Sequence, residues 1–196
     1  MYARLAECLN AAKVNHNKHI MTLQTLKDAH VYCVVNRIPS QKYGSLIEKY
    51  IINKYNFTKN NPSDAIGDCS KHHMNVEIKS SLGGASHNKF NFVQIRISQN
   101  VSTYILTAYH LTVDNLNDGG DLYVFRIPKC RMKHLLVKYG TYAHGTTLKN
   151  GKITMESLCD VNNMKEYALR PTYGGKCWNE IVKFRSNLIS YVHLDQ

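Results

Sequence analysis

The chain has 196 residues, of which 43% are hydrophobic and 20% charged, with only 11 glycines and 4 prolines. This composition excludes a disordered or collagen-like chain and predicts one folded domain over 1–196. The net charge of +11 at pH 7 favours a polyanionic partner, with nucleic acid as the first candidate, and no apolar run is long enough for a membrane-spanning helix.

The cysteines and the N-terminus bear on the compartment. Six cysteines are scattered singly along the chain, without a Cys-x-x-Cys pair. The first residues include Glu7 and lack the long apolar stretch of a secretion signal. We therefore expect reduced thiols in a cytoplasmic protein with no small-molecule cofactor.

The N-terminal part, about 1–60, is predicted to be helical. Helices are expected over 2–13 and 40–55, with a short strand or buried turn over 30–35 between them. On the second helix, Glu48 falls within a broad arc of apolar side chains. Because a charge that faces a core needs a partner, Glu48 either binds a metal ion or lies at the rim of the arc and reaches solvent.

The central part, about 62–127, is predicted to form a β-sheet. A pair of short strands comes first, and the segment 88–98 that follows fits either a crossover helix or an extended segment. Two strongly β-prone runs complete the sheet. The predicted strands are 65–70, 74–80, 103–112 and 122–127.

The C-terminal part, about 128–196, is basic and is predicted to contain two helices. A helix is expected over 131–139, then a loop-like stretch over 141–152 and a final helix over 178–191. The order of all these elements predicts a single α/β domain in which helices flank a mixed β-sheet.

The segment Gly67–Ser81 carries the candidate chemistry. If His72 and His73 form a hairpin turn, Asp68 faces Glu77 and Lys79 lies on the same face. Carboxylates on directly opposed residues, with Cβ atoms roughly 4.5–5.5 Å apart, repel each other. A divalent cation removes that repulsion, and oxygen ligands favour Mg²⁺, for which Mn²⁺ can substitute.

These residues resemble the signature of the PD-(D/E)xK nuclease superfamily. Asp68 is followed after eight residues by Glu77-Ile78-Lys79, and the preceding helix carries Glu48. Further segments resemble type II restriction endonucleases of that superfamily, over about 39–185: FVQIR, TYILTAYHL, LYVFRIP, KYGTYAHGT and LRPTYGGKCWNEIVKFR. The resemblance implies a restriction-endonuclease-like core, Mg²⁺-dependent and sequence-specific cleavage of double-stranded DNA, and a homodimer.

One departure from the signature concerns its first acid. Pro62 lies six residues before Asp68 rather than next to it, so Asp64 is an alternative metal ligand. The hairpin register favours Asp68, because Asp64 would face Ser81, beyond the Asp68–Glu77 pair.

Phosphodiester hydrolysis gives each candidate a role. Asp68, Glu77 and the backbone carbonyl of Ile78 would bind Mg²⁺, and Glu48 would hold the same or a second ion. Lys79 would orient the attacking water or stabilise developing negative charge. Gln94 would brace the site from the crossover, or make a plain structural hydrogen bond.

The basic C-terminal part supplies the candidate DNA contacts. From Leu122 to Met155 there is no Asp or Glu, and basic residues alternate with aromatics and histidines. Such a surface suits contact with phosphates and bases. The candidates are Lys138, Tyr142, His144, Thr146, Lys149 and Lys176, while Trp178 is expected to anchor the core.

Two other functions fit the same sequence. One keeps the fold and makes the protein a structure-specific repair nuclease or junction resolvase. The other is a non-catalytic, basic nucleic-acid-binding protein in which Asp68, Glu77 and Lys79 are incidental.

Overall fold

The structure is a computed structural model that describes residues 40–61, 63–83, 88–112, 115 and 120–186. The predicted helix over 2–13 and the predicted strand or turn over 30–35 lie outside these ranges. None of the helices within them is long and apolar enough to cross a membrane.

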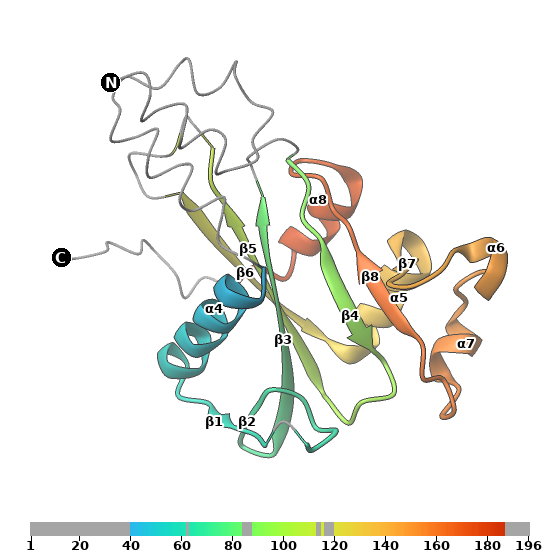
Figure 1. Ribbon diagram of the computed structural model, residues 1–196, viewed down its shortest axis with the longest axis horizontal. Coiled ribbons are helices and arrows are strands. Elements are labelled where there is room, and N and C mark those ends of the chain that lie inside the picture. Colours follow the sequence, from blue (N-terminus) through green and yellow to red (C-terminus); the bar gives the residue numbers. More distant parts are fainter. Residues whose placement is uncertain (1–39, 62, 84–87, 113–114, 116–119, 187–196) are drawn as a thin grey trace.

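A five-stranded mixed sheet forms the centre of the fold (Figure 1). Its strands lie in the order β1-β2-β3-β5-β6, with β3 and β5 parallel and the other neighbours antiparallel. The strands are β1 (Thr58–Lys59), β2 (Cys69–Lys71), β3 (Met74–Gly83), β5 (Thr103–His110) and β6 (Asp121–Pro128). The α/β class and the mixed sheet predicted from the sequence are therefore confirmed.

A second sheet, which the sequence did not predict, has three strands in the order β4-β8-β7. These are β4 (Phe92–Arg96), β7 (Thr141–Tyr142) and β8 (Glu166–Leu169). Of the two alternatives for 88–98, the extended one is thus observed. The stretch predicted as a loop at 141–152 contains β7 and the short helix α6 (Thr147–Asn150).

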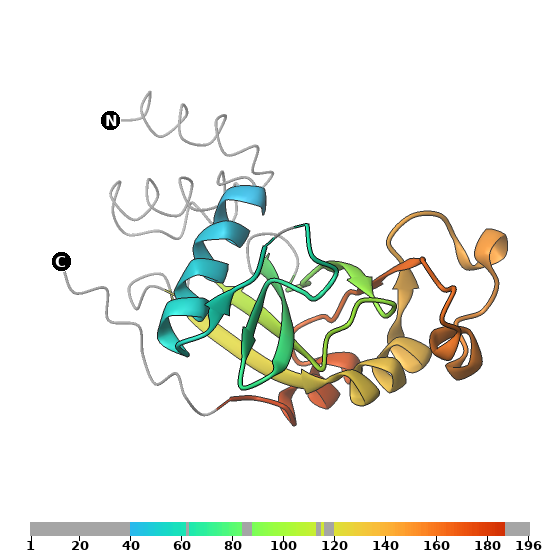
Figure 2. The ribbon, with the colours of Figure 1, turned by 90° about the horizontal axis from the view of Figure 1, so that it is seen from below.

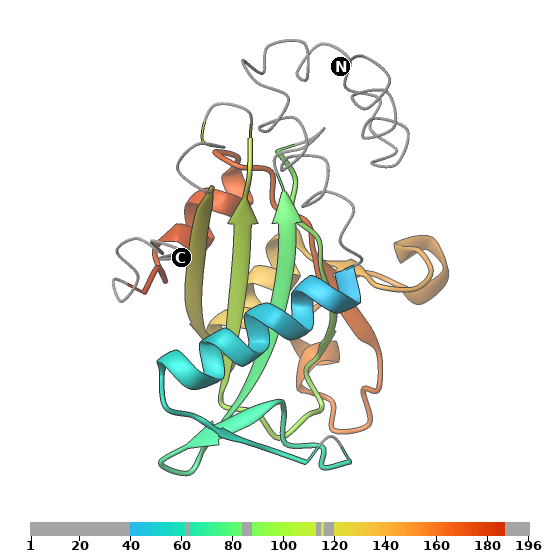
Figure 3. The same ribbon diagram turned by 60° about the vertical axis from the view of Figure 1, so that its left-hand side comes forward.

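Helices cover both faces of the five-stranded sheet. The helix α4 (Ser40–Lys54) crosses in front of β3, β5 and β6 in Figure 3. Figure 2 shows α5 (Lys129–Tyr139) and α8 (Lys176–Val182) on the other side, with α7 (Met155–Cys159) beyond them. The sheet is therefore flanked by helices, as expected.

The prediction that the last helix extends to residue 191 was wrong, because α8 ends at Val182. The chain turns tightly there, with Arg185 N–H donating to the Val182 carbonyl at 2.9 Å. Ser186 N–H then donates to Val124 O at 2.8 Å, and Arg126 N–H donates to Phe184 O at 2.9 Å. Pairing with β6 takes the place of further helical turns over these residues.

Alternation along the strands divides the core into two clusters. One cluster, between the sheet and α4, contains Val76, Ile78, Ile105 and Val124. Side chains of the intervening positions point the other way, toward the second sheet, α5 and α8. They include Tyr104, Leu106, Phe125 and Ile127. Since β3 alternates in the same way, the side chains of Glu77 and Lys79 lie on this second face.

The turn of the β2–β3 hairpin is built from two histidines, as predicted. His72 and His73 have positive φ values of 48° and 64°. Two consecutive left-handed residues are typical of the type I′ turn, which prefers Asn-Gly. The register Cys69↔Val76, Ser70↔Asn75 and Lys71↔Met74 agrees with the predicted one.

We expect the double substitution His72→Asn with His73→Gly to stabilise the protein by about 1 kcal/mol, because it relieves two left-handed side chains. Both histidines are exposed, so no packing is lost. Urea denaturation measures the change. Placing valine at both positions is the matched control and should lower stability; an increase with valine would contradict the turn geometry.

Candidate active site

Asp68 is fixed against β3 by its backbone and by its side chain. Its N–H donates to Val76 O at 2.9 Å, and its Oδ2 accepts the N–H of Ile78 at 2.7 Å. The residue before it, Gly67, has a φ of 85°, and a Cβ there would lie 2.6 Å from Val76 O. Only glycine allows this approach, so the sequence at Gly67 helps to place the carboxylate of Asp68.

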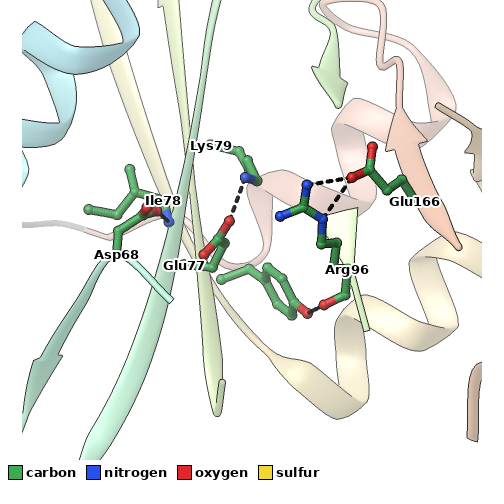
Figure 4. Close-up of polar contacts among 7 residues, drawn as sticks. Asp68, Glu77, Ile78, Lys79, Arg96 and Glu166 are labelled. Atoms are coloured by element: carbon green, nitrogen blue, oxygen red, sulfur yellow. Dashed lines mark hydrogen bonds and ion pairs between the residues drawn. The ribbon is translucent and has the colours of Figure 1, made fainter. Parts of the chain in front are cut away.

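Glu77 and Lys79 form an ion pair on the buried side of β3 (Figure 4). Lys79 Nζ contacts Glu77 Oε1, and Glu77 is only 4% exposed. Burial raises the pKa of Glu77, the positive charge of Lys79 partly offsets this, and the negative charge of Asp68 adds to it. The two carboxylates are thus close enough to repel each other, and the lysine partly compensates.

The negative charges of the three predicted acids all act on the thiol of Cys69, which packs on the α4 side of the sheet. Burial raises the pKa of the Cys69 thiol to about 12, with further contributions from the negative charges of Asp68, Glu48 and Glu77. Glu48 itself extends from α4 to the surface, where Lys59 Nζ lies 3.3 Å from its Oε1. Its carboxylate is therefore paired with a lysine at the rim of the apolar arc.

The alternative ligand, Asp64, is exposed in a turn closed by its own N–H to Asn61 O at 3.0 Å. Ser81, its expected partner, instead accepts the N–H of Asn91 at 2.8 Å. Asp68 is the aspartate whose charge acts on Glu77.

The structure does not bring Gln94 into hydrogen-bonding contact with the described residues of the site. Gln94 is exposed, with a φ of 57°, in a β4 segment where the register shifts between Phe92 and Ile95. Two residues later, Arg96 lies on the side of the site, and its positive charge offsets a small part of the rise in the pKa of Glu77 that burial causes. Sequence reasoning missed Arg96, because the bulge interrupts the alternation that would have shown which way it points.

Among the described residues, no group of three or more His, Cys, Asp or Glu side chains could hold a metal ion. A magnesium ion needs fewer, since it is usually bound by one or two carboxylates and completes its shell with waters and phosphate oxygens. Asp68 and Glu77 each accept a bond on one oxygen and retain further lone pairs. The N–H and C=O of a residue in a strand point to the same edge, so the carbonyl of Ile78 lies beside Asp68. This donor set fits Mg²⁺ or Mn²⁺.

The predicted DNA contacts are dispersed over the C-terminal part. Lys149 and Lys176 are exposed. Lys138 is exposed at the end of α5, with Nζ 3.5 Å from Glu180 Oε1. Thr146 caps α6 by accepting the N–H of Lys149.

Two more of the predicted DNA contacts have structural partners. Tyr142 is buried in β7, and its hydroxyl donates to Asn150 O at 3.2 Å, so its ring is unavailable to a base. His144 is exposed, and its Nε2 lies 3.4 Å from Glu166 Oε2.

We expect acid to weaken metal binding at this site. The weakening should begin at a higher pH than at a site whose carboxylates have ordinary pKa values. Burial raises the pKa of Glu77 above its usual 4.5, and the cation needs the ionised form. Below the raised pKa, the dissociation constant for Mn²⁺ should increase about tenfold per pH unit. Loss of the free-ion electron paramagnetic resonance signal measures binding. The control, Glu77→Gln, should bind weakly with no such dependence, and wild-type affinity that is constant down to pH 4.5 would contradict the assignment.

Comparisons with protein-family models, with curated proteins and with solved structures find no match to this chain.

Proposed function

We propose that the protein is a Mg²⁺-dependent endonuclease that hydrolyses phosphodiester bonds in double-stranded DNA at a specific sequence, as type II restriction enzymes do. One observation carries the proposal: the buried Glu77–Lys79 ion pair on β3 lies beside the carboxylate of Asp68, the residue just before the neighbouring strand β2. The spacing of these three residues is the one that resembles the PD-(D/E)xK signature.

The buried ion pair is hard to explain by stability alone. A pair taken out of water contributes little or even destabilises compared with apolar residues of similar size. Like charges of Asp68 and Glu77 add to the cost, as the raised pKa of Glu77 reflects. A titratable group whose pKa is shifted by burial and by neighbouring charges, as that of Glu77 is, is typical of functional sites.

Each group then has a task in hydrolysis. Asp68, Glu77 and the Ile78 carbonyl would hold Mg²⁺, which when bound acidifies water and neutralises charge on the phosphate. The ammonium of Lys79 donates hydrogen bonds to the attacking water or to a non-bridging phosphate oxygen, where negative charge develops. The new P–O bond comes from water, and one P–O ester bond breaks.

The charge of the chain fits a DNA partner. A net charge of +11 attracts a polyanion, and phosphate contacts by Lys and Arg dominate affinity for nucleic acid. A homodimer would match the two-fold symmetry of a short palindromic site. Light scattering of the purified protein tests that state.

Digestion of a fully sequenced plasmid tests the function. We expect cleavage in Mg²⁺ or Mn²⁺ at one short sequence, and none in EDTA. Sequencing of the ends maps the site, and a Lys79→Ala preparation made in parallel excludes a contaminating nuclease. Cleavage governed by branch structure would favour the repair nuclease or resolvase, and the absence of nicking with either metal would favour the non-catalytic DNA-binding protein.

A further inference from the structure

Arg96 is held at the edge of the site by a carboxylate on a neighbouring strand. Arg96 ends β4 directly opposite Glu166 in β8. Its Nε donates to Glu166 Oε1 at 2.7 Å, and its Nη2 lies 2.5 Å from the same oxygen. Figure 4 shows the guanidinium between Glu166 and the Glu77–Lys79 pair.

The backbone of Arg96 is tied to the strands that carry the site. The hydroxyl of Tyr104 donates to Arg96 O at 2.7 Å. Tyr104 is fully buried in β5 and stands opposite Glu77 in the parallel register. The position of Arg96 relative to Glu77 is therefore set by strand pairing and by a buried hydrogen bond. Burial raises the pKa of Glu77, and the Arg96 charge offsets part of that rise.

The guanidinium remains able to bind a second anion. It carries five N–H donors in a planar fork, and the contacts with Glu166 use Nε and Nη2. The Arg96 side chain is 45% exposed, whereas that of Lys79 is 18% exposed and already paired with Glu77. Arginine forks suit phosphate oxygens, which they bind by two parallel hydrogen bonds.

We propose that Arg96 binds a phosphate of the DNA backbone at or next to the cleaved bond. This inference rests on the proposed function and adds to it a DNA-binding residue that the sequence motif does not contain. The competing explanation is that the Arg96–Glu166 pair only joins β4 to β8. The two explanations predict different effects of an Arg96 substitution on DNA affinity and cleavage.

Arg96→Ala should weaken DNA binding in Ca²⁺ at least about tenfold, the effect of losing a charge-assisted hydrogen bond. The dependence of log affinity on log salt should become shallower by about one. In Mg²⁺ its kcat/KM should fall roughly 100-fold. Arg96→Lys keeps the charge without the fork and should give an intermediate loss, with its folding checked by thermal denaturation.

The matched control is Arg126→Ala. Arg126 is an exposed arginine opposite Ile105 in the β5–β6 register, which places it on the α4 face of the sheet, away from Glu77. Its removal changes the net charge equally, so a loss common to both variants measures the general charge effect only.

Neutral methylphosphonate groups, placed one at a time at the phosphates around the mapped cleavage position, locate the contact. At the phosphate that Arg96 binds, the wild-type protein should lose affinity and Arg96→Ala should lose no more. If the wild type cleaves DNA but Arg96→Ala behaves like Arg126→Ala with every substrate, the inference about Arg96 is overturned while the proposed function stands. If the wild type cleaves no DNA, the proposed function is overturned, and the inference about Arg96 falls with it.

Discussion

Replacing Lys79 by alanine is expected to abolish Mg²⁺-dependent cleavage while DNA binding in Ca²⁺ persists. The ammonium of Lys79 contacts Glu77, a proposed metal ligand, and the other two side chains of the motif are carboxylates that cannot replace it as a donor. Loss of one donor to developing charge costs roughly 100- to 1000-fold in rate. Single-turnover cleavage measures this loss, and a gel-shift titration in Ca²⁺ measures binding.

A second variant guards against an effect on folding. Without Lys79, Glu77 would remain buried with no cation in contact, which destabilises a folded protein. Lys79→Gln keeps a hydrogen-bond donor next to Glu77 and should be equally inactive. The matched control is Lys183→Ala, which removes an exposed lysine paired with Glu180 at 2.8 Å and should cleave normally. Full activity of Lys79→Ala would discard the site.

Trp178→Ala is expected to produce the largest loss of stability, about 3–5 kcal/mol. Trp178 in α8 is buried among four aromatic rings with centroid distances of 4.9 to 5.3 Å. Those rings come from distant parts of the chain: Phe90, Tyr123, Phe125 and Tyr173. Removal of the indole leaves a cavity between α8 and β6, and the urea midpoint of unfolding should fall accordingly.

Leu148→Ala is the control for that measurement. Leu148 is a large apolar residue in α6 that is 97% exposed, so its truncation should change stability by no more than about 0.5 kcal/mol. A loss below about 1 kcal/mol for Trp178→Ala would contradict the packing around α8.

The elements that could be predicted from the sequence are those specified by residues close to one another in the chain. Strongly β-prone runs predicted β5 and β6, and the hairpin from Asp68 to Lys79 followed from its two-residue turn. Because Asp68, Glu77 and Lys79 lie within twelve positions of one another, their proximity could be derived from strand register alone.

The contacts that could not be predicted join residues far apart in the sequence. Arg96 and Glu166 are separated by 70 positions, and only the pairing of β4 with β8 makes them neighbours. A register shift in β4 also hides its alternation, and the short β7 and β8 carry little signal of their own. The second sheet, and with it Arg96, was therefore beyond the reach of local patterns.

The hydrogen bond between the Asp68 carboxylate and the Ile78 N–H fixes the number of residues that can separate Asp68 from Glu77. The Asp68 carboxylate accepts the N–H of Ile78, the residue between Glu77 and Lys79. The position of Asp68 is therefore tied to the backbone that links the other two residues. A one-residue insertion within β3 before Glu77 would turn Glu77 and Lys79 toward α4 and leave that amide out of reach. We therefore expect this hairpin to tolerate substitution of its exposed side chains, but not insertion or deletion of a residue between Asp68 and Glu77.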